Sequence, residues 1–128
     1  MSYREWVKTD HIRTGIADRW QLLFRDFDVV LCPVMPTPAF AHDHSEKAAR
    51  RIFVDGTEIP YGDQIMWNGN ATLAGLPSTA MPIGLSSEGL PIGMQIIGPA
   101  MEDRTTLAFA ELVEREYGGF LAPPAFKS

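Results

Sequence analysis

The stretch AGLPSTAMPIGLSSEGLPIGMQIIGP, residues 74–99, decides the fold. It places Gly-Leu-Pro ahead of each of two apolar runs, and each run closes on Ile-Gly. Glycine admits a positive φ and proline fixes φ near its extended value, so each Gly-Leu-Pro predicts a tight start to a strand. The connection 85–88 is short and polar. We therefore expect residues 78–83 and 92–97 to form neighbouring antiparallel strands.

A helix and a strand are predicted ahead of this pair. Ser2 and Glu5 have the spacing of a capping box, in which the hydroxyl and the carboxylate each bind a free backbone N–H group. Beyond them, bulky apolar residues recur every three or four positions, which predicts a helix over residues 3–25 with one apolar face. The apolar run 29–32 ends at Pro33 and predicts a strand covered on both faces.

The rest of the chain is expected to hold a small hairpin and two further helical segments. Asp55-Gly56 suits a type I′ turn between two short apolar segments. Residues 61–74 are apolar with few breakers, which indicates a short or broken helix. Asp103 is a candidate cap for a last helix. The core face expected for that helix is formed by Leu107, Ala110, Val113 and Tyr117.

These patterns resemble the C-terminal end of the amidase signature family. The resemblance rests on residues 74–99, on DVVLCP at 28–33 and on EDRT at 102–105. Members of that family hydrolyse carboxamides or transfer the ammonia released from them. The resemblance implies an α/β fold class, with a mixed β-sheet flanked by the first and last helices as a partial amidase-signature fold. We expect residues 1–128 to form a single domain, the C-terminal segment of such a fold.

The catalytic residues that the family uses have no counterpart in this sequence. Amidase signature enzymes use a serine nucleophile, a second serine on a cis peptide and a lysine, and their serines lie in a long stretch rich in glycine and serine. The only adjacent serines here are Ser86 and Ser87, in the short connection between the two strands. The lysines Lys8, Lys47 and Lys127 have no family-like neighbours. We therefore assign no catalytic residue and expect the chain alone to hydrolyse no amide.

Three functions remain open. The leading hypothesis is a C-terminal fragment of an amide hydrolase or amidotransferase, produced by a shortened gene, a split gene or artificial truncation. The alternatives are an interaction or dimerisation module without enzyme activity, and one half of a split amidase whose N-terminal portion is a separate chain. A fragment of this kind leaves sheet edges and an apolar face uncovered. We expect it to form a homo-oligomer, by strand exchange through residues 77–98, or to bind the missing portion; a small amide is the expected substrate of the complete enzyme only.

Trp67, Asn68 and Asn70 are the candidate substrate-pocket residues. They lie just before the first Gly-Leu-Pro, and in the family this segment lies near the wall of the substrate funnel. The resemblance therefore implies that these three residues line the pocket. The alternative is a tryptophan in the core with asparagines near helix ends.

The sequence offers one cluster of potential metal ligands, His42-Asp43-His44. Its spacing matches no zinc pattern, so we expect two solvated histidines in a loop and no metal site. The glycines follow neither phosphate-loop spacing, and no cofactor is expected.

Composition narrows the partners. The 128 residues carry a net charge of −5, and clustered basic residues of the kind that bind phosphates are absent, so nucleic acid is not an expected partner. No apolar run reaches the length of a membrane span, and the start is charged where a signal peptide is apolar. Cys32 is the single cysteine. We therefore expect a cytoplasmic, reducing setting and no membrane partner.

Overall fold

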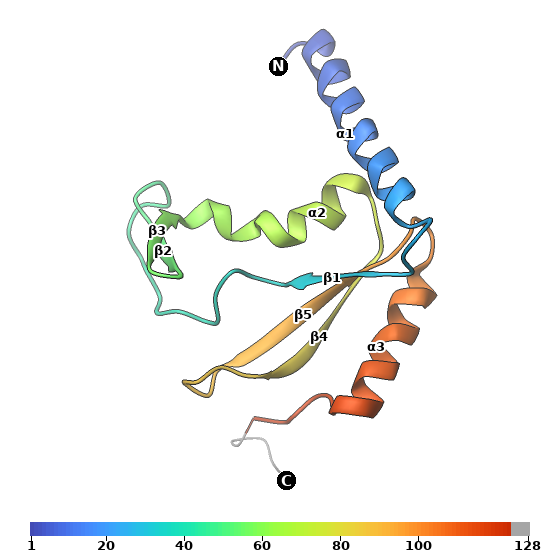
Figure 1. The fold of residues 1–128 in the computed structure, drawn as a ribbon. Coiled ribbons are helices and arrows are strands. Elements are labelled where there is room, and N and C mark those ends of the chain that lie inside the picture. Colours follow the sequence, from blue (N-terminus) through green and yellow to red (C-terminus); the bar gives the residue numbers. More distant parts are fainter. Residues whose placement is uncertain (124–128) are drawn as a thin grey trace.

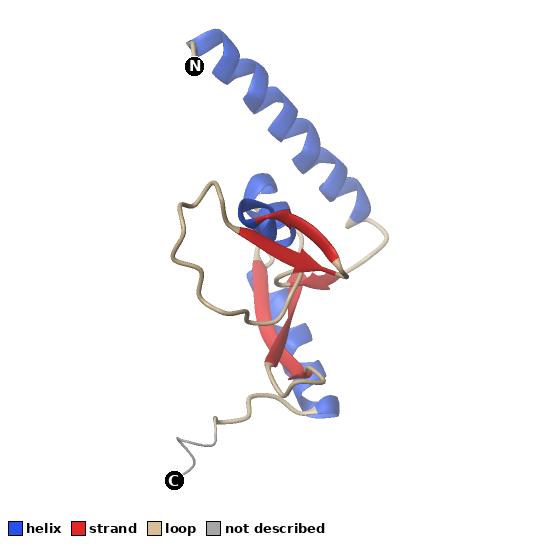
Figure 2. Cartoon of the chain, turned by 90° about the vertical axis from the view of Figure 1, so that its left-hand side faces the viewer, coloured by secondary structure: helices blue, strands red, loops and turns tan. Residues whose placement is uncertain are grey.

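In the computed structural model, which describes residues 1–123, a three-stranded sheet lies between helices (Figures 1 and 2). Its strands are β1 (Val30–Pro33), β5 (Pro91–Ile97) and β4 (Ser78–Leu85), in that order across the sheet. The predicted strand pair is confirmed as β4 and β5. Both pairings are antiparallel, whereas the sequence predicts a mixed sheet. The short connection between β4 and β5 can join only antiparallel strands, and β1 also runs opposite to β5.

The central strand β5 is buried from both sides. Successive side chains of a strand point to opposite faces of the sheet, yet Ile96 is 0% and Ile97 is 1% exposed. The face that carries Ile97 packs against α2 (Met66–Ala74), through Ala71 and Ala74. The expected α/β class and its layered arrangement follow from this two-sided cover.

Helix α3 (Asp103–Tyr117) covers the opposite face of the sheet. Thr79, the register partner of Ile96, donates a 2.8 Å hydrogen bond from its hydroxyl to the hydroxyl of Thr106, which is 1% exposed. The core face expected for this helix is partly wrong, because Leu107 and Tyr117 are exposed. The buried face of α3 instead includes Thr106, the residue before Leu107. Although Thr106 is polar, its hydroxyl makes hydrogen bonds to Thr79 and Asp103.

The start of α3 differs from the prediction by one residue. Glu102 is the N-cap residue, and its side chain accepts no hydrogen bond from a backbone N–H group of the first turn, so Asp103 is the first helical residue and not the cap. Instead, the Thr105 hydroxyl donates to the Glu102 carboxylate at 3.0 Å. A carboxylate in the first turn still interacts favourably with the helix dipole.

Helix α1 (Tyr3–Leu23) reaches the core only at its C-terminal end. It begins at the predicted capping box: the Ser2 N–H donates to the Glu5 carboxylate at 2.6 Å, and the Glu5 N–H donates to the Ser2 hydroxyl at 3.3 Å. No residue of α1 is buried, and its N-terminal turns project away from the sheet (Figure 1). The residues that reach the core cluster are Ala17 and Trp20, followed by Phe24 just beyond the helix. Neither α1 nor another helix within residues 1–123 is long and apolar enough to cross a membrane.

The elements between β1 and β4 form where the sequence predicts them. The strands β2 (Arg51–Val54) and β3 (Thr57–Pro60) form a hairpin, and Asp55 and Gly56 have φ values of 49° and 77°, as a type I′ turn requires. The predicted broken helix consists of the 3₁₀ segment η1 (Tyr61–Ile65) and α2. Gly75 ends α2 with a φ of 69°, which supplies the tight turn expected of Gly-Leu-Pro.

Candidate functional site

An apolar groove lies between α3 and the sheet. It has a volume of about 540 Å³. We call it the α3 groove. Its main apolar lining consists of Leu31, Ile83, Met94, Phe109, Val113 and Tyr117. Among residues 1–123, no serine, lysine, histidine or carboxylate lines it, and its one ionisable side chain is that of Tyr117. The lining is otherwise apolar, so the α3 groove suits contact with another apolar surface.

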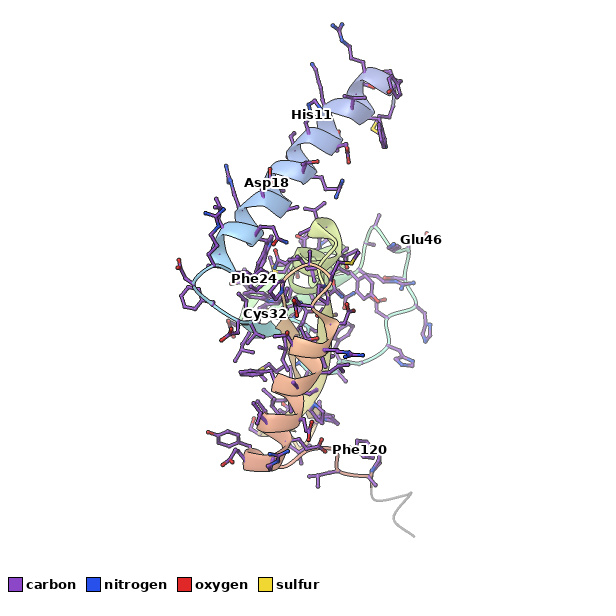
Figure 3. The ribbon with its side chains drawn as sticks, turned by 90° about the vertical axis from the view of Figure 1, so that its right-hand side faces the viewer. His11, Asp18, Phe24, Cys32, Glu46 and Phe120 are labelled. Carbon is purple, nitrogen blue, oxygen red and sulfur yellow. The ribbon has the colours of Figure 1, made fainter. Side chains whose placement is uncertain are left out.

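A second groove lies between the projecting part of α1 and the end of α2. It measures about 490 Å³. We call it the α1 groove. It is lined by Trp6, Thr9, Asp10, Ile12, Arg13, Ile16 and Leu73. The Arg13 Nε donates to an Asp10 carboxylate oxygen at 2.8 Å in the middle of this lining. Figure 3 labels His11 on this projecting part of α1, Asp18 further along the helix, and Phe24 where the chain reaches the core.

A third groove, of about 410 Å³, lies beside the proline-rich segment that follows β1. Thr37 lines this groove, and its hydroxyl oxygen is buried and has no hydrogen-bond partner among residues 1–123. A buried polar group without a partner is the kind of group that a polar ligand or water satisfies. Sequence reasoning missed Thr37, because nothing in the sequence around a threonine shows whether its hydroxyl is buried or paired.

The exposed surface of the chain is larger than its mass accounts for. Its accessible area is 9803 Å² for 14.2 kDa. A folded monomer of that mass exposes about 6,800 Å² on the usual scaling. The difference of about 3,000 Å² exceeds the roughly 800 Å² per partner of a standard interface. The chain is therefore less compact than a folded monomer of its mass, and large apolar side chains such as Trp6, Ile12 and Leu73 are exposed.

The predicted pocket residues lie together on α2. Trp67 and Asn68 are half-buried, and Asn70 is exposed. The carbonyl oxygen of Trp67 accepts a 3.4 Å hydrogen bond from Nε2 of Gln95 in β5. The three residues line neither the α3 groove nor the α1 groove. Their role at a substrate pocket stays a prediction.

Gln95 is a buried polar residue that sequence reasoning missed. It is 4% exposed, and its Nε2 lies 3.4 Å from Sγ of Cys32. Burial raises the pKa of the Cys32 thiol, and the hydrogen bond from Gln95 opposes that shift. At neutral pH the thiol is therefore protonated and a poor nucleophile. The only sign of Gln95 in the sequence is a polar residue inside an otherwise apolar strand.

The adjacent serines serve the turn between β4 and β5. The Ser86 hydroxyl oxygen accepts hydrogen bonds from the backbone N–H groups of Glu88 at 3.3 Å and Leu90 at 3.1 Å. Within residues 1–123, no hydrogen bond joins a serine to a lysine. A serine nucleophile needs a base that takes its proton, so the described chain presents no activated serine.

His42 and His44 lie in the loop between β1 and β2, with their ring centroids 6.0 Å apart and edge to face. They line a shallow groove of about 250 Å³ with Arg50 and Tyr61, and the Arg50 guanidinium lies 5.6 Å from the Tyr61 ring centroid. The described residues contain no group of three side chains arranged to hold a metal ion.

The family model described as Amidase matches residues 1–107. The chain therefore belongs to the Amidase family. Among its relatives, the A subunit of glutamyl-tRNA(Gln) amidotransferase from Xanthobacter autotrophicus is 37% identical over 116 residues, which are 90% of this chain and 22% of that protein. The corresponding protein of Zymomonas mobilis is 32% identical over 120 residues, 93% of this chain and 22% of that protein. The chain thus spans about a fifth of the length of these relatives.

Solved structures agree with the family assignment. The A subunit of glutamyl-tRNA(Gln) amidotransferase from Thermotoga maritima superposes with a TM-score of 0.75 at 27% identity, covering 92% of this chain and 25% of that one. A chain of a vestigial complex, described as revealing the origins of an s-triazine catabolic enzyme, gives a TM-score of 0.81 at 23% identity, with 96% and 26% coverage. The partial amidase-signature fold is therefore confirmed.

Proposed function

We propose that residues 1–128 form one domain that supplies the C-terminal section of an amidase-signature enzyme, while the catalytic serines and lysine belong to another section of that fold. One observation carries the proposal: the Amidase match covers residues 1–107, yet the chain spans only about 22% of its relatives. The absence of any serine–lysine hydrogen bond in the described residues agrees with it.

The other section has two kinds of surface to join. The α3 groove is apolar, and the outer edges of β1 and β4 are the edges of the sheet, since β5 lies between them. β4 carries Pro82 and a bulge at Pro82–Gly84, as edge strands commonly do. An adjoining α/β section can extend the sheet and fill the groove. Association of this kind covers part of the area of about 3,000 Å² by which the exposed surface exceeds that of a compact monomer.

The reaction of the assembled enzyme is hydrolysis of a small carboxamide or transfer of its ammonia. In that assembly Trp67, Asn68 and Asn70 line the substrate pocket, and no cofactor takes part. A cytoplasmic, reducing setting suits the single free Cys32.

The test of this proposal is ammonia release by the purified chain. We expect no release from simple amides above the blank. The control is the double variant Ser86→Ala, Ser87→Ala, which is expected to behave like the parent. Turnover by the parent that the double variant loses contradicts the proposal, because it would place a nucleophile in this section.

A second candidate is an interaction module that works without catalysis by forming homo-oligomers. The observation that favours it is the exposed area of 9803 Å², which leaves room for more than one interface.

A further inference from the structure

We propose that two copies of this chain associate through their α1 grooves, with the two α1 helices packed antiparallel about a two-fold axis. The proposal uses α1 and the end of α2 only. It deepens the second candidate above, the interaction module, and it does not depend on the amidase section, which uses the α3 groove and the sheet edges.

The projecting part of α1 lacks a partner of its own. Trp6 is 51% exposed, and Ile12 and Leu73 are exposed as well. Contact with the core begins only at Ala17. The preceding turns amount to about 14 residues, and an isolated helix of that length is marginally stable in water. A partner in the α1 groove therefore stabilises the helix as well as covering its apolar side chains.

The lining of the α1 groove is complementary to itself. In an antiparallel pair centred near residue 11, Trp6 of each copy lies beside Ile16 of the other, and Asp10 lies beside Arg13. Each copy thus brings an aromatic anchor to an aliphatic side chain and a carboxylate to a guanidinium. An interface with two-fold symmetry requires this reciprocity, in which one residue meets a second and the second meets the first.

The available area agrees with a dimer. The excess of about 3,000 Å² over a compact monomer of this mass accommodates a standard interface of roughly 800 Å² per copy. Strand exchange through residues 77–98 would require the existing β4–β5 pairing to open. Contact between α1 helices breaks no pairing in the described chain, so α1 is the favoured surface.

The test measures the mass of the chain by light scattering after size exclusion, for the parent and two charge variants. The parent is expected at twice 14.2 kDa. Asp10→Arg and Arg13→Asp each place like charges across the two-fold axis, and each should weaken the dimer about tenfold or more. Mixed in equal amounts, the two variants again pair opposite charges and should regain the dimer mass.

The mixture separates an interface from a folding effect. Both variants lose the Asp10–Arg13 ion pair within the chain, and mixing does not restore that pair. Matched controls are Asp18→Arg and Arg19→Asp, which make the same changes outside the groove and should stay dimeric. Circular dichroism checks that the charge variants keep their fold apart from the first turns of α1, which lose their partner in the monomer. A monomeric parent, variants as dimeric as the parent, or a mixture that stays monomeric each overturns the proposal.

Discussion

Thr79 in β4 and Thr106 in α3 are joined by a 2.8 Å hydrogen bond that fixes the last helix on the sheet. The Thr106 hydroxyl in turn donates to the carbonyl oxygen of Asp103 at 2.9 Å. The two hydroxyls and the carbonyl thus form a chain of hydrogen bonds. The sequence separation of 27 residues means that this contact, rather than local helix propensity, orients α3.

Removing the buried hydroxyl should destabilise the fold. Thr106→Val keeps the shape of the side chain but leaves the Thr79 hydroxyl without its acceptor, so we expect a loss of about 1 to 3 kcal/mol in the free energy of unfolding. Thr79→Val with Thr106→Val should cost less than the sum of the single changes, because no hydroxyl is then left unpaired. Thr105→Ser, on the same helix, keeps the hydroxyl that binds Glu102; it is the control and should lie within about 0.5 kcal/mol. Urea denaturation measures all four, and additive losses would contradict the contact.

Gly98 should tolerate no side chain while Thr106 keeps its methyl group. A Cβ at Gly98 would lie 2.6 Å from Cγ2 of Thr106. Gly98→Ala should therefore cost about 1 to 3 kcal/mol through overpacking. Adding Thr106→Ser, which removes the methyl group and keeps the hydroxyl, should recover part of that loss. Gly62→Ala has open space and serves as the control. Denaturation curves that show no recovery in the double variant count against the close approach.

Truncating side chains in β5 and in the turn between β4 and β5 should change the free energy of unfolding unequally. Ile96→Ala removes a fully buried side chain and should cost about 2 to 5 kcal/mol. Ser86→Ala removes two hydrogen bonds in the turn and should cost about 0.5 to 1.5 kcal/mol. Ser87→Ala should lie within about 0.5 kcal/mol of the parent. If chemical denaturation gives three equally small changes, β5 is not the central strand.

The Cys32 thiol should react slowly in the folded chain. Burial raises its pKa, so folding favours the protonated form. The resulting stability is complete below the pKa of the unfolded chain and is lost as the pH rises through the folded pKa. At pH 8 a disulfide reagent should therefore modify Cys32 more slowly than in the chain unfolded by urea. Equal rates in the two states would show that the thiol is not shielded.

Local chemistry in the sequence accounts for most of the elements. The capping box at Ser2 and Glu5, the turn at Asp55-Gly56 and the two Gly-Leu-Pro starts act through neighbouring backbone atoms, and the structure places each as predicted. The strand pair was also predictable, because a short polar connection leaves few alternatives to an antiparallel hairpin.

Contacts between distant segments were not predictable from local pattern. The buried face of α3 is set by Thr106 meeting β4, and apolar periodicity favoured Leu107 instead. The position of α1 depends on where its last turns meet the core, and its length gave no indication that the first turns would project. Gln95 and Thr37 are defined by what surrounds them in space. The sequence alone does not show whether a polar residue in a strand or loop is buried, or which groups surround it.

The most direct test of the central claim is reconstitution of amide hydrolysis. The catalytic section of the Xanthobacter autotrophicus relative, without its segment matched by this chain, is expressed with and without this chain, and ammonia release from a simple amide is measured. We predict release from the pair and none from either part alone, with Ile96→Ala in this chain reducing the gain. Release by this chain alone, or no gain when the two sections are combined, would contradict the claim that it is the C-terminal section of an amidase-signature enzyme.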